Sequence, residues 1–266
     1  MIREAIAADP KLNKLSYEIF GQGSYANDTN VRLNSDIDIN IRLNSTFFTG
    51  YQNGKSDSDY GFESSAYSFR EYKTDVANAL VNHFGAGNVR HRDKCVEVIG
   101  NSYRVQADIV PTFKYILFTE NNSRREGSKF ISDSGNVHYN YAKQHIENGK
   151  AKNLATGKRF KRLVRILKRI RYRMIADQAP VNSNITSFLI EGLLWNVPNN
   201  IYNNELTWTG RLKESIIYIY EQSQNQQPCK EWGEVSEYLY LFHAERKWSI
   251  ENVHEFMEQL WQYVEF

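Results

Sequence analysis

The chain has 266 residues, of which 41% are hydrophobic and 24% charged, and its formal net charge is +2. This composition is that of a globular chain large enough for one large domain or two small lobes, and it excludes a disordered tail and a histone-like polycation. Only two cysteines occur, Cys95 and Cys229, so we expect neither a cysteine-based zinc site nor a disulfide framework.

The N-terminal residues lack a basic segment followed by an apolar core, and no run of about 18 apolar residues occurs. We therefore expect neither a signal peptide nor a membrane-spanning segment. Together with the low cysteine content, this predicts a reducing, cytoplasmic setting.

The first part of the chain mixes a helix with strands. Residues 1–15 read as a helix broken near Pro10, and a short apolar run at 17–20 is followed by the glycines and serine of 21–24. Residues 36–43 read DIDINIRL, in which apolar and polar side chains alternate, and this period of two predicts a strand. The next residues, 44–65, are rich in Ser, Gly, Asp and Asn and predict an exposed loop.

A helix and more strands follow. Apolar residues recur at helical steps over 66–84, and Gly85 follows as a stop signal. Two strands are predicted at 94–99 and 103–110, joined by a hairpin turn at Gly100 and Asn101. A further strand is predicted at 113–118, and residues 119–129 read as a polar loop.

The second half is predicted to be helical. One apolar stripe runs through Phe160, Leu163, Val164, Leu167, Ile170 and Met174, and further helices are predicted over 184–196, 211–222 and roughly 250–264. The change from strands to helices predicts an α+β chain with a mixed lobe at 1–150 and a helical lobe at 151–266.

Three carboxylates form the most informative pattern. Asp36 and Asp38 share one face of a strand because they are two residues apart. Asp108 lies in the predicted strand YRVQADIV, where a polar side chain requires a partner. Paired carboxylates repel each other unless a cation lies between them, and Mg²⁺ prefers such hard oxygen ligands. The pattern predicts a two-metal platform for phosphoryl transfer, in which Asp108 can also receive a proton.

Gly23 and Ser24 precede this strand. A glycine allows the backbone to approach a phosphate closely, and the hydroxyl and the following N–H groups can contact anionic oxygens. An Asp-x-Asp alone more often marks a solvated strand face. The Gly-Ser pair and the carboxylate in a second strand favour the catalytic interpretation.

The segment GQGSYANDTNVRLNSDIDINIRL resembles the signature of the polymerase-β-like nucleotidyltransferases, and more narrowly that of the bacterial CD-NTases, relatives of cyclic GMP-AMP synthase. Gly23, Ser24, Thr29, Asp36 and Asp38 fall on that pattern, and Asp108 matches the third metal-binding carboxylate. In the second half, FKRLVRILKRI resembles the family's helix with a triphosphate-binding lysine, which would be Lys168. ITSFLIEGLLWNVP resembles the following helix, with Ser187 as a phosphate contact.

This resemblance implies an active site in a cleft between the two lobes, NTP substrates, and Mg²⁺, with Mn²⁺ as a possible substitute. It implies a cyclic di- or trinucleotide product that activates an effector protein in antiphage (CBASS) signalling. Transfer of nucleotides to RNA or protein is an alternative, and a catalytically inactive nucleic-acid-binding or regulatory module is a second. A monomer is expected. The sequence leaves base preference, linkage, ring size and trigger open.

The charge is unevenly distributed. From Lys143 to Arg173 there are twelve Lys or Arg residues and one acid, Glu147. Such a cluster indicates a polyanion, and triphosphate and nucleic acid both qualify. Most of these side chains are interpreted as the solvated face of a helix, with Lys168 reaching the triphosphate, and binding of a regulatory RNA or DNA stays open.

Overall fold

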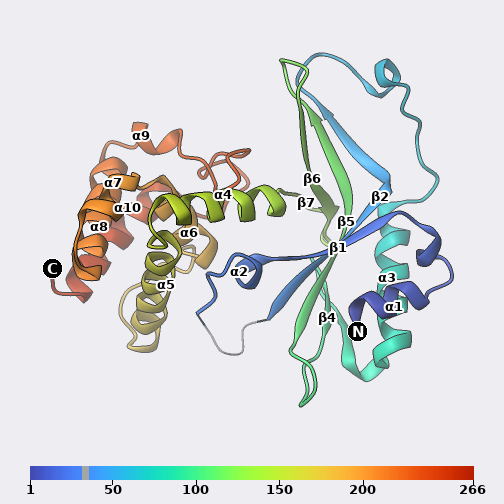
Figure 1. The fold of residues 1–266 in the computed structure, drawn as a ribbon, viewed down its shortest axis with the longest axis horizontal. Coiled ribbons are helices and arrows are strands. Elements are labelled where there is room, and N and C mark those ends of the chain that lie inside the picture. The colour runs from blue at the N-terminus through green and yellow to red at the C-terminus, as the bar shows by residue number, and fades with distance from the viewer. Residues whose placement is uncertain (32–35) are drawn as a thin grey trace. The chain divides into compact units, whose positions relative to one another are not determined.

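The computed structural model describes residues 1–31 and 36–266, which form two compact units. Unit 1 comprises Met1–Ala26 and residues 36–143, and unit 2 comprises Asn27–Val31 and Gln144–Phe266. The helical unit thus includes five residues from the N-terminal half, and the predicted lobes at 1–150 and 151–266 stay a prediction. The predicted α+β class is confirmed, since a mixed unit with a sheet is combined with a helical unit (Figure 1).

The sheet of unit 1 has seven strands (Figure 1). Five follow the order β1-β2-β5-β4-β3, and β6 and β7 continue from β5. Their bounds are β1 (Tyr17–Gln22), β2 (Ile37–Tyr51), β3 (Val89–His91), β4 (Val96–Val98), β5 (Ala107–Phe118), β6 (Arg124–Ile131) and β7 (Val137–Asn140). β2 and β5 are parallel, whereas the other pairs are antiparallel.

Strand pairing extends the sheet beyond the sequence-based prediction. The alternating segment does form β2, but β2 continues to Tyr51 through residues that were predicted to be a loop. A register shift between Leu43 and Phe47 interrupts the ladder, and Phe47–Tyr51 then pair with Lys114–Phe118. The predicted loop at 119–129 is likewise wrong over most of its length, because β6 pairs with the same part of β5. Hydrogen bonding to a neighbouring strand decided both segments against their polar composition.

Helices cover one face of this sheet. Unit 1 also contains α1 (Ile2–Ala8), α2 (Gly23–Ala26), α3 (Phe69–Phe84) and the 3₁₀ turns η1 (Leu12–Lys14), η2 (Asp57–Tyr60) and η3 (Ala86–Asn88). α3 begins after a capping box of Ser68 and Glu71, three residues later than the helix predicted over 66–84, and ends before Gly85, the predicted stop. Tyr72 of α3 packs in one core with Ile41 of β2, and its hydroxyl donates to the Ile41 carbonyl at 3.0 Å. The apolar side of β2 therefore faces α3.

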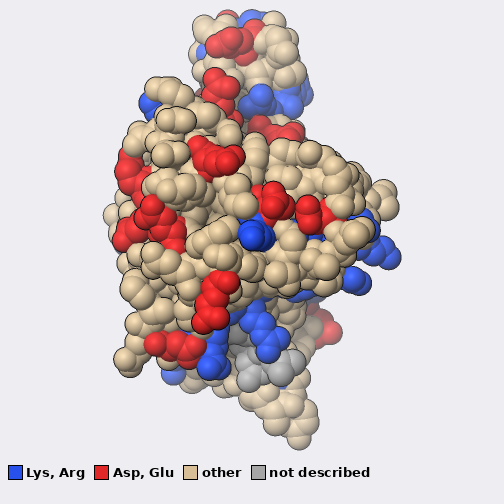
Figure 2. All heavy atoms as spheres, turned by 90° about the vertical axis from the view of Figure 1, so that its left-hand side faces the viewer, with Lys and Arg blue, Asp and Glu red and all other residues tan. Residues whose placement is uncertain are grey.

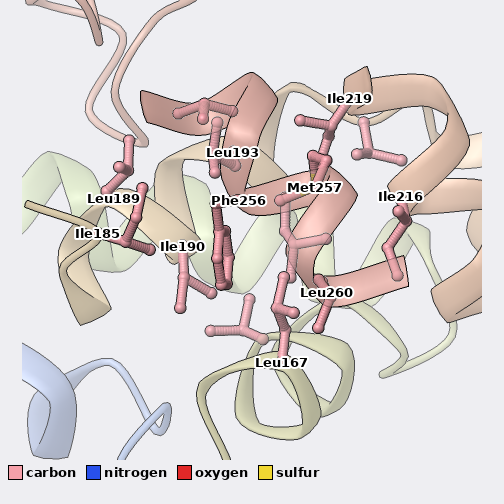
Figure 3. Close-up of a cluster of buried hydrophobic side chains, with 14 of the residues drawn as sticks. Leu167, Ile185, Leu189, Ile190, Leu193, Ile216, Ile219, Phe256, Met257 and Leu260 are labelled. Atoms are coloured by element: carbon pink, nitrogen blue, oxygen red, sulfur yellow. The ribbon is translucent and has the colours of Figure 1, made fainter. Parts of the chain in front are cut away.

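Unit 2 is built from helices. They are α4 (Ala142–Ala155), whose first two residues lie in unit 1, α5 (Phe160–Ala176), α6 (Ser187–Asn196), α7 (Asn199–Asn204), α8 (Trp208–Gln224), α9 (Gln227–Lys230) and α10 (Ile250–Tyr263). Figure 3 shows their apolar side chains converging, with Leu167 of α5, Leu193 of α6 and Phe256 of α10 in one core. The apolar stripe predicted for α5 is this buried face. No helix in the described part of the chain is long and apolar enough to cross a membrane.

Candidate active site

Two carboxylates meet on the polar face of the sheet. Asp38 of β2 lies directly opposite Asp108 of β5 in the parallel ladder. Because side chains alternate along a strand, Asp38 and Asn40 point away from the face that Ile41 presents to α3. Asp36 immediately precedes β2 and is exposed. Adjacent parallel strands thus bring together two acids that are 70 residues apart in sequence.

These carboxylates perturb one another. Burial, followed by the negative charges of Asp108 and Asp36, raises the pKa of Asp38 from 3.8 to about 6. Burial and the charge of Asp36 also raise the pKa of Asp108, while a hydrogen bond from the Cys95 thiol opposes that rise. The ionised forms are therefore costly unless positive charge lies nearby.

The donor set matches a hard divalent cation. Carboxylate oxygens are the ligands that Mg²⁺ prefers, and the charge of Asp36 lies close enough to raise the pKa of both Asp38 and Asp108. Within residues 1–31 and 36–266, no group of three His, Cys, Asp or Glu side chains is already arranged to hold a metal ion. The residues fit the ion chemically, because Mg²⁺ binds through one or two carboxylates and completes its coordination with waters and phosphate oxygens.

Gly23 lies against Asp38. It has a φ of +68°, a left-handed conformation that favours glycine, and a Cβ built there would lie 2.0 Å from the Asp38 Oδ2 atom. Ser24 follows it in the short helix α2 and is partly exposed. Gly23 therefore lies against Asp38 in unit 1, and the role predicted for Ser24 stays a prediction.

A buried polar network lies on the same face and was missed by sequence reasoning. Gln22 Oε1 accepts hydrogen bonds from the side-chain amides of Asn40 at 3.1 Å and Asn140 at 3.0 Å. The Thr112 hydroxyl donates to Asn40 Oδ1 at 2.7 Å, and both Asn40 and Thr112 are fully buried. Satisfied networks of this kind hold the strands rigidly beneath the carboxylates. The alternation of β2 identifies Asn40, but its partners come from other strands.

A third strand supplies another acid that sequence reasoning missed. Glu97 of β4 lies opposite Asp108, on the side away from Asp38. Glu97 is buried and pairs with Arg92, whose Nη2 lies 2.7 Å from the Glu97 carboxylate. The negative charge of Glu97 raises the pKa of Asp108, and the positive charge of Arg92 lowers it. Arg92 thus moderates the negative charge around Asp108.

Thr29 and Lys168 meet in unit 2 around a buried glutamate. Lys168 Nζ lies 2.9 Å from Glu191 Oε2 and 3.1 Å from Thr29 Oγ1, and the Thr29 hydroxyl donates to Glu191 Oε2 at 2.8 Å. His145 Nε2 lies 3.0 Å from the other carboxylate oxygen. Thr29 is fully buried and Lys168 is 2% exposed. We call Thr29, His145, Lys168 and Glu191 the Glu191 network.

The Glu191 network is electrostatically strong. Burial alone would raise the pKa of Glu191, but the hydrogen bond from His145 and the charge of Lys168 outweigh it and hold the pKa at about 2. The prediction that Lys168 contacts a triphosphate remains a prediction, because in this structure its ammonium group is occupied by Glu191 and Thr29.

Ser187 begins α6 and is partly exposed, and its hydroxyl lies 3.0 Å from the Tyr172 hydroxyl. Lys161 was interpreted from the sequence as part of a solvated face. It is instead buried, and that burial lowers the pKa of its ammonium group. The two hydroxyl residues and Lys161 all belong to unit 2.

A parallel strand pair with carboxylates on its polar face, a Gly-Ser turn against them and a following helical unit define the nucleotidyltransferase class. Residues 147–265 match the family model of the cGAS/DncV-like nucleotidyltransferase C-terminal helical domain. The chain is 54% identical over 266 residues to the cyclic dipyrimidine nucleotide synthase CdnE of Cecembia lonarensis, covering 100% of this chain and 90% of that one.

Solved structures agree with this match. The CdnE cyclic dinucleotide synthase of Elizabethkingia meningoseptica, solved with GTP and Apcpp, matches with a TM-score of 0.83 at 34% identity. The match covers 100% of this chain and 90% of that chain. The CdnE c-UMP-AMP synthase of Rhodothermus marinus, solved with Apcpp and Upnpp, has a TM-score of 0.87 at 28% identity, with coverage of 100% and 89%. The chain belongs to the cGAS/DncV-like nucleotidyltransferases, the CD-NTases.

Proposed function

We propose that this CD-NTase joins nucleoside triphosphates into a cyclic di- or trinucleotide and releases pyrophosphate. The observation that supports this most directly is the position of Asp38 opposite Asp108, with Gly23 packed against Asp38. The full-length similarity to chains named as cyclic nucleotide synthases supports the class of product.

The reaction is two phosphoryl transfers. A ribose hydroxyl oxygen of one nucleotide attacks the α-phosphorus of another, the bond from that phosphorus to the β-phosphate oxygen breaks, and pyrophosphate leaves. Asp108 accepts the proton of the attacking hydroxyl, since it lies beside Asp38 on the polar face of the sheet. A second attack of the same kind closes the ring.

Asp36, Asp38 and Asp108 would hold the divalent metal ions, Mg²⁺ with Mn²⁺ as a substitute, which would neutralise charge on the phosphates. Gly23 lets the backbone approach the triphosphate because it lacks a Cβ, and Ser24 and Ser187 offer hydroxyl groups to it. Thr29 and Lys168 serve nucleotide binding indirectly, through the Glu191 network that holds the residues following Ser24.

The product contains pyrimidine nucleotides, because the relative that is 54% identical is named for a cyclic dipyrimidine. The enzyme acts as a monomer in the cytoplasm, within an antiphage (CBASS) system, and its product activates an effector protein.

The test is incubation of the full chain with each α-labelled NTP, and with all four together, in Mg²⁺ or Mn²⁺. Phosphatase treatment and chromatography follow. A phosphatase-resistant small product is expected, labelled most strongly by UTP or CTP. Asp108→Asn should remove it, whereas Asp57→Asn, at an exposed site in η2, should not.

Label on added RNA or protein in place of a small product would establish transfer to a macromolecule. Absence of turnover under all these conditions, with nucleotide binding also absent, would establish an inactive module. A purine-only cyclic product would keep the enzyme class and contradict the pyrimidine assignment.

A further inference from the structure

One side of α5 lines a cavity that the proposed reaction does not use. This cavity lies in unit 2 and has a volume of about 470 Å³. Arg162, Arg165 and Arg169 of α5 line it together with Trp208 of α8, and Asn30 and Val31 border it. Three cationic side chains and no carboxylate thus face one space in this part of the described structure.

The arginines form a stripe of their own. Arg162, Arg165 and Arg169 recur at three- and four-residue steps and therefore share one side of the helix. Lys161 and Lys168 lie seven residues apart on a neighbouring side, about a quarter turn away at 3.6 residues per turn, and both are buried. The arginine stripe is therefore separate from the Glu191 network.

The stripe carries unused hydrogen-bond donors. Arg165 donates to the Asp28 carbonyl oxygen and lies 3.5 Å from the Asp28 carboxylate. Arg162 and Arg169 are exposed, and neither has a hydrogen bond or ion pair with any residue in the described ranges. Each guanidinium presents five N–H donors in a plane, a geometry that suits phosphate oxygens.

Trp208 adds an aromatic surface to this charge. It is the first residue of α8 and remains 36% exposed, while Arg211 lies over its ring at 5.0 Å. Base stacking on an aromatic side chain beside phosphate-binding cations is how proteins hold single-stranded nucleic acid. A volume of about 470 Å³ is within the usual range for small-ligand sites and suits one nucleotide unit.

We propose that this cavity binds single-stranded nucleic acid, with phosphates on Arg162, Arg165 and Arg169 and one base on Trp208. The ligand is a polymer because Arg162 and Arg169 lie seven residues apart on α5, about 10 Å at 1.5 Å per residue, a span that suits successive phosphates of a strand. Figure 2 shows one face of the molecule, on which Lys and Arg side chains are distributed with Asp and Glu side chains among them. A base within a duplex is stacked and would not reach Trp208.

The experiment is fluorescence anisotropy of a labelled 12-nucleotide single-stranded RNA of mixed sequence with the full chain, between 50 and 200 mM salt. Saturable binding that weakens with salt is expected. Arg162→Ala/Arg169→Ala should weaken binding more than about tenfold and reduce the magnitude of the salt slope by about 1.4. Trp208→Ala should weaken it roughly 5- to 100-fold.

Matched controls separate a site from general charge. Arg173→Ala removes a cation of the same helix that is already paired with Asp177, and Tyr240→Ala removes another exposed aromatic ring of unit 2. Both should bind within about twofold of the parent chain. Far-ultraviolet circular dichroism checks that each variant is folded.

Four outcomes would overturn the proposal. They are absence of saturable binding at 50 mM salt, equal loss in Arg173→Ala and in the double arginine variant, equal binding of a 12-base-pair duplex, and displacement of the RNA by a free nucleotide at the same phosphate concentration. Absence of saturable binding would show that there is no site, and equal loss in the two arginine variants would show that binding depends on diffuse charge. Equal binding of the duplex would show that no free base is needed. Displacement by a free nucleotide would show that the cavity is a mononucleotide site.

Discussion

Replacing Glu191 by Gln would remove one negative charge from the centre of the Glu191 network and leave the side-chain volume almost unchanged. Lys168 and His145 would then lie buried beside a neutral amide. Breaking a buried ion pair by neutralising one partner is strongly destabilising, because it leaves the other charge uncompensated.

The size of the loss follows from the pKa. The pKa of Glu191 is about 2 in the folded chain and 4.5 ordinarily, so its carboxylate form contributes about 3 kcal/mol to the free energy of unfolding at neutral pH. The folded pKa is the lower one. The contribution is therefore fully present above pH 4.5 and disappears as the pH falls towards 2, with less than half of it left at about pH 3.

Tryptophan fluorescence measures this directly. All five tryptophans of the chain lie in unit 2, so urea unfolding followed by fluorescence reports on the unit that contains Glu191. We expect Glu191→Gln to lower the unfolding free energy by about 3 kcal/mol at pH 7, and the difference from the parent chain to narrow at pH 3.

Glu234 supplies the control within the same unit. Burial raises its pKa, and the charge of Arg246 only partly opposes that rise. Glu234 also pairs with Arg246, but folding favours its protonated form, so the difference between Glu234→Gln and the parent chain should change in the opposite direction as the pH falls. A Glu191→Gln loss below about 1 kcal/mol, or a difference that does not change with pH, would refute the reasoning.

Three further predictions concern the carboxylate site. Asp38→Asn should reduce the yield of cyclic product at least about 100-fold. It should not lower the free energy of unfolding, because it also removes the repulsion between Asp38 and Asp108. Activity within about tenfold of the parent chain would contradict the assignment. Gly23→Ala adds backbone strain of roughly 1–2 kcal/mol and places a Cβ on Asp38, so the yield of cyclic product should fall at least about 100-fold. Gly54→Ala is the control: Gly54 has a φ of +72° and open space around it, so the variant carries the same strain and should stay active. Chelation by EDTA should stop turnover and added Mg²⁺ or Mn²⁺ should restore it, and turnover that persists in EDTA would contradict the metal assignment.

The sequence predicted the carboxylate pair because a strand has a strict period of two. Once DIDINIRL is a strand, Asp38 must share a face with Asn40, and an acid in a second apolar strand must meet a polar surface. Gly23 was predictable for a similar reason, since a glycine before a catalytic strand indicates close backbone approach, and here the approach is to Asp38 itself.

Long-range pairing was not predictable in the same way. Lys168 and Thr29 are 139 residues apart, and Thr29 and Glu191 are 162 apart, so no local pattern connects them. On a helix as basic as α5, charge alone does not separate a buried lysine from a solvated arginine. Glu97 and Cys95 escaped notice because their closeness to Asp108 depends on strand register.

Asn27–Val31 packs with residues that follow it by more than a hundred positions, and this sets an order of events during synthesis. At about 5–20 residues per second, a ribosome needs roughly 8–30 s to proceed from Thr29 to Glu191. Within that interval Arg165 and Lys168 emerge before Glu191, so the partners of Asp28 and Thr29 become available one after another. The strands that carry Asp38 and Asp108 are therefore made well before Asn27–Val31 can pack fully, and a nascent chain that ends before α6 lacks the Glu191 network.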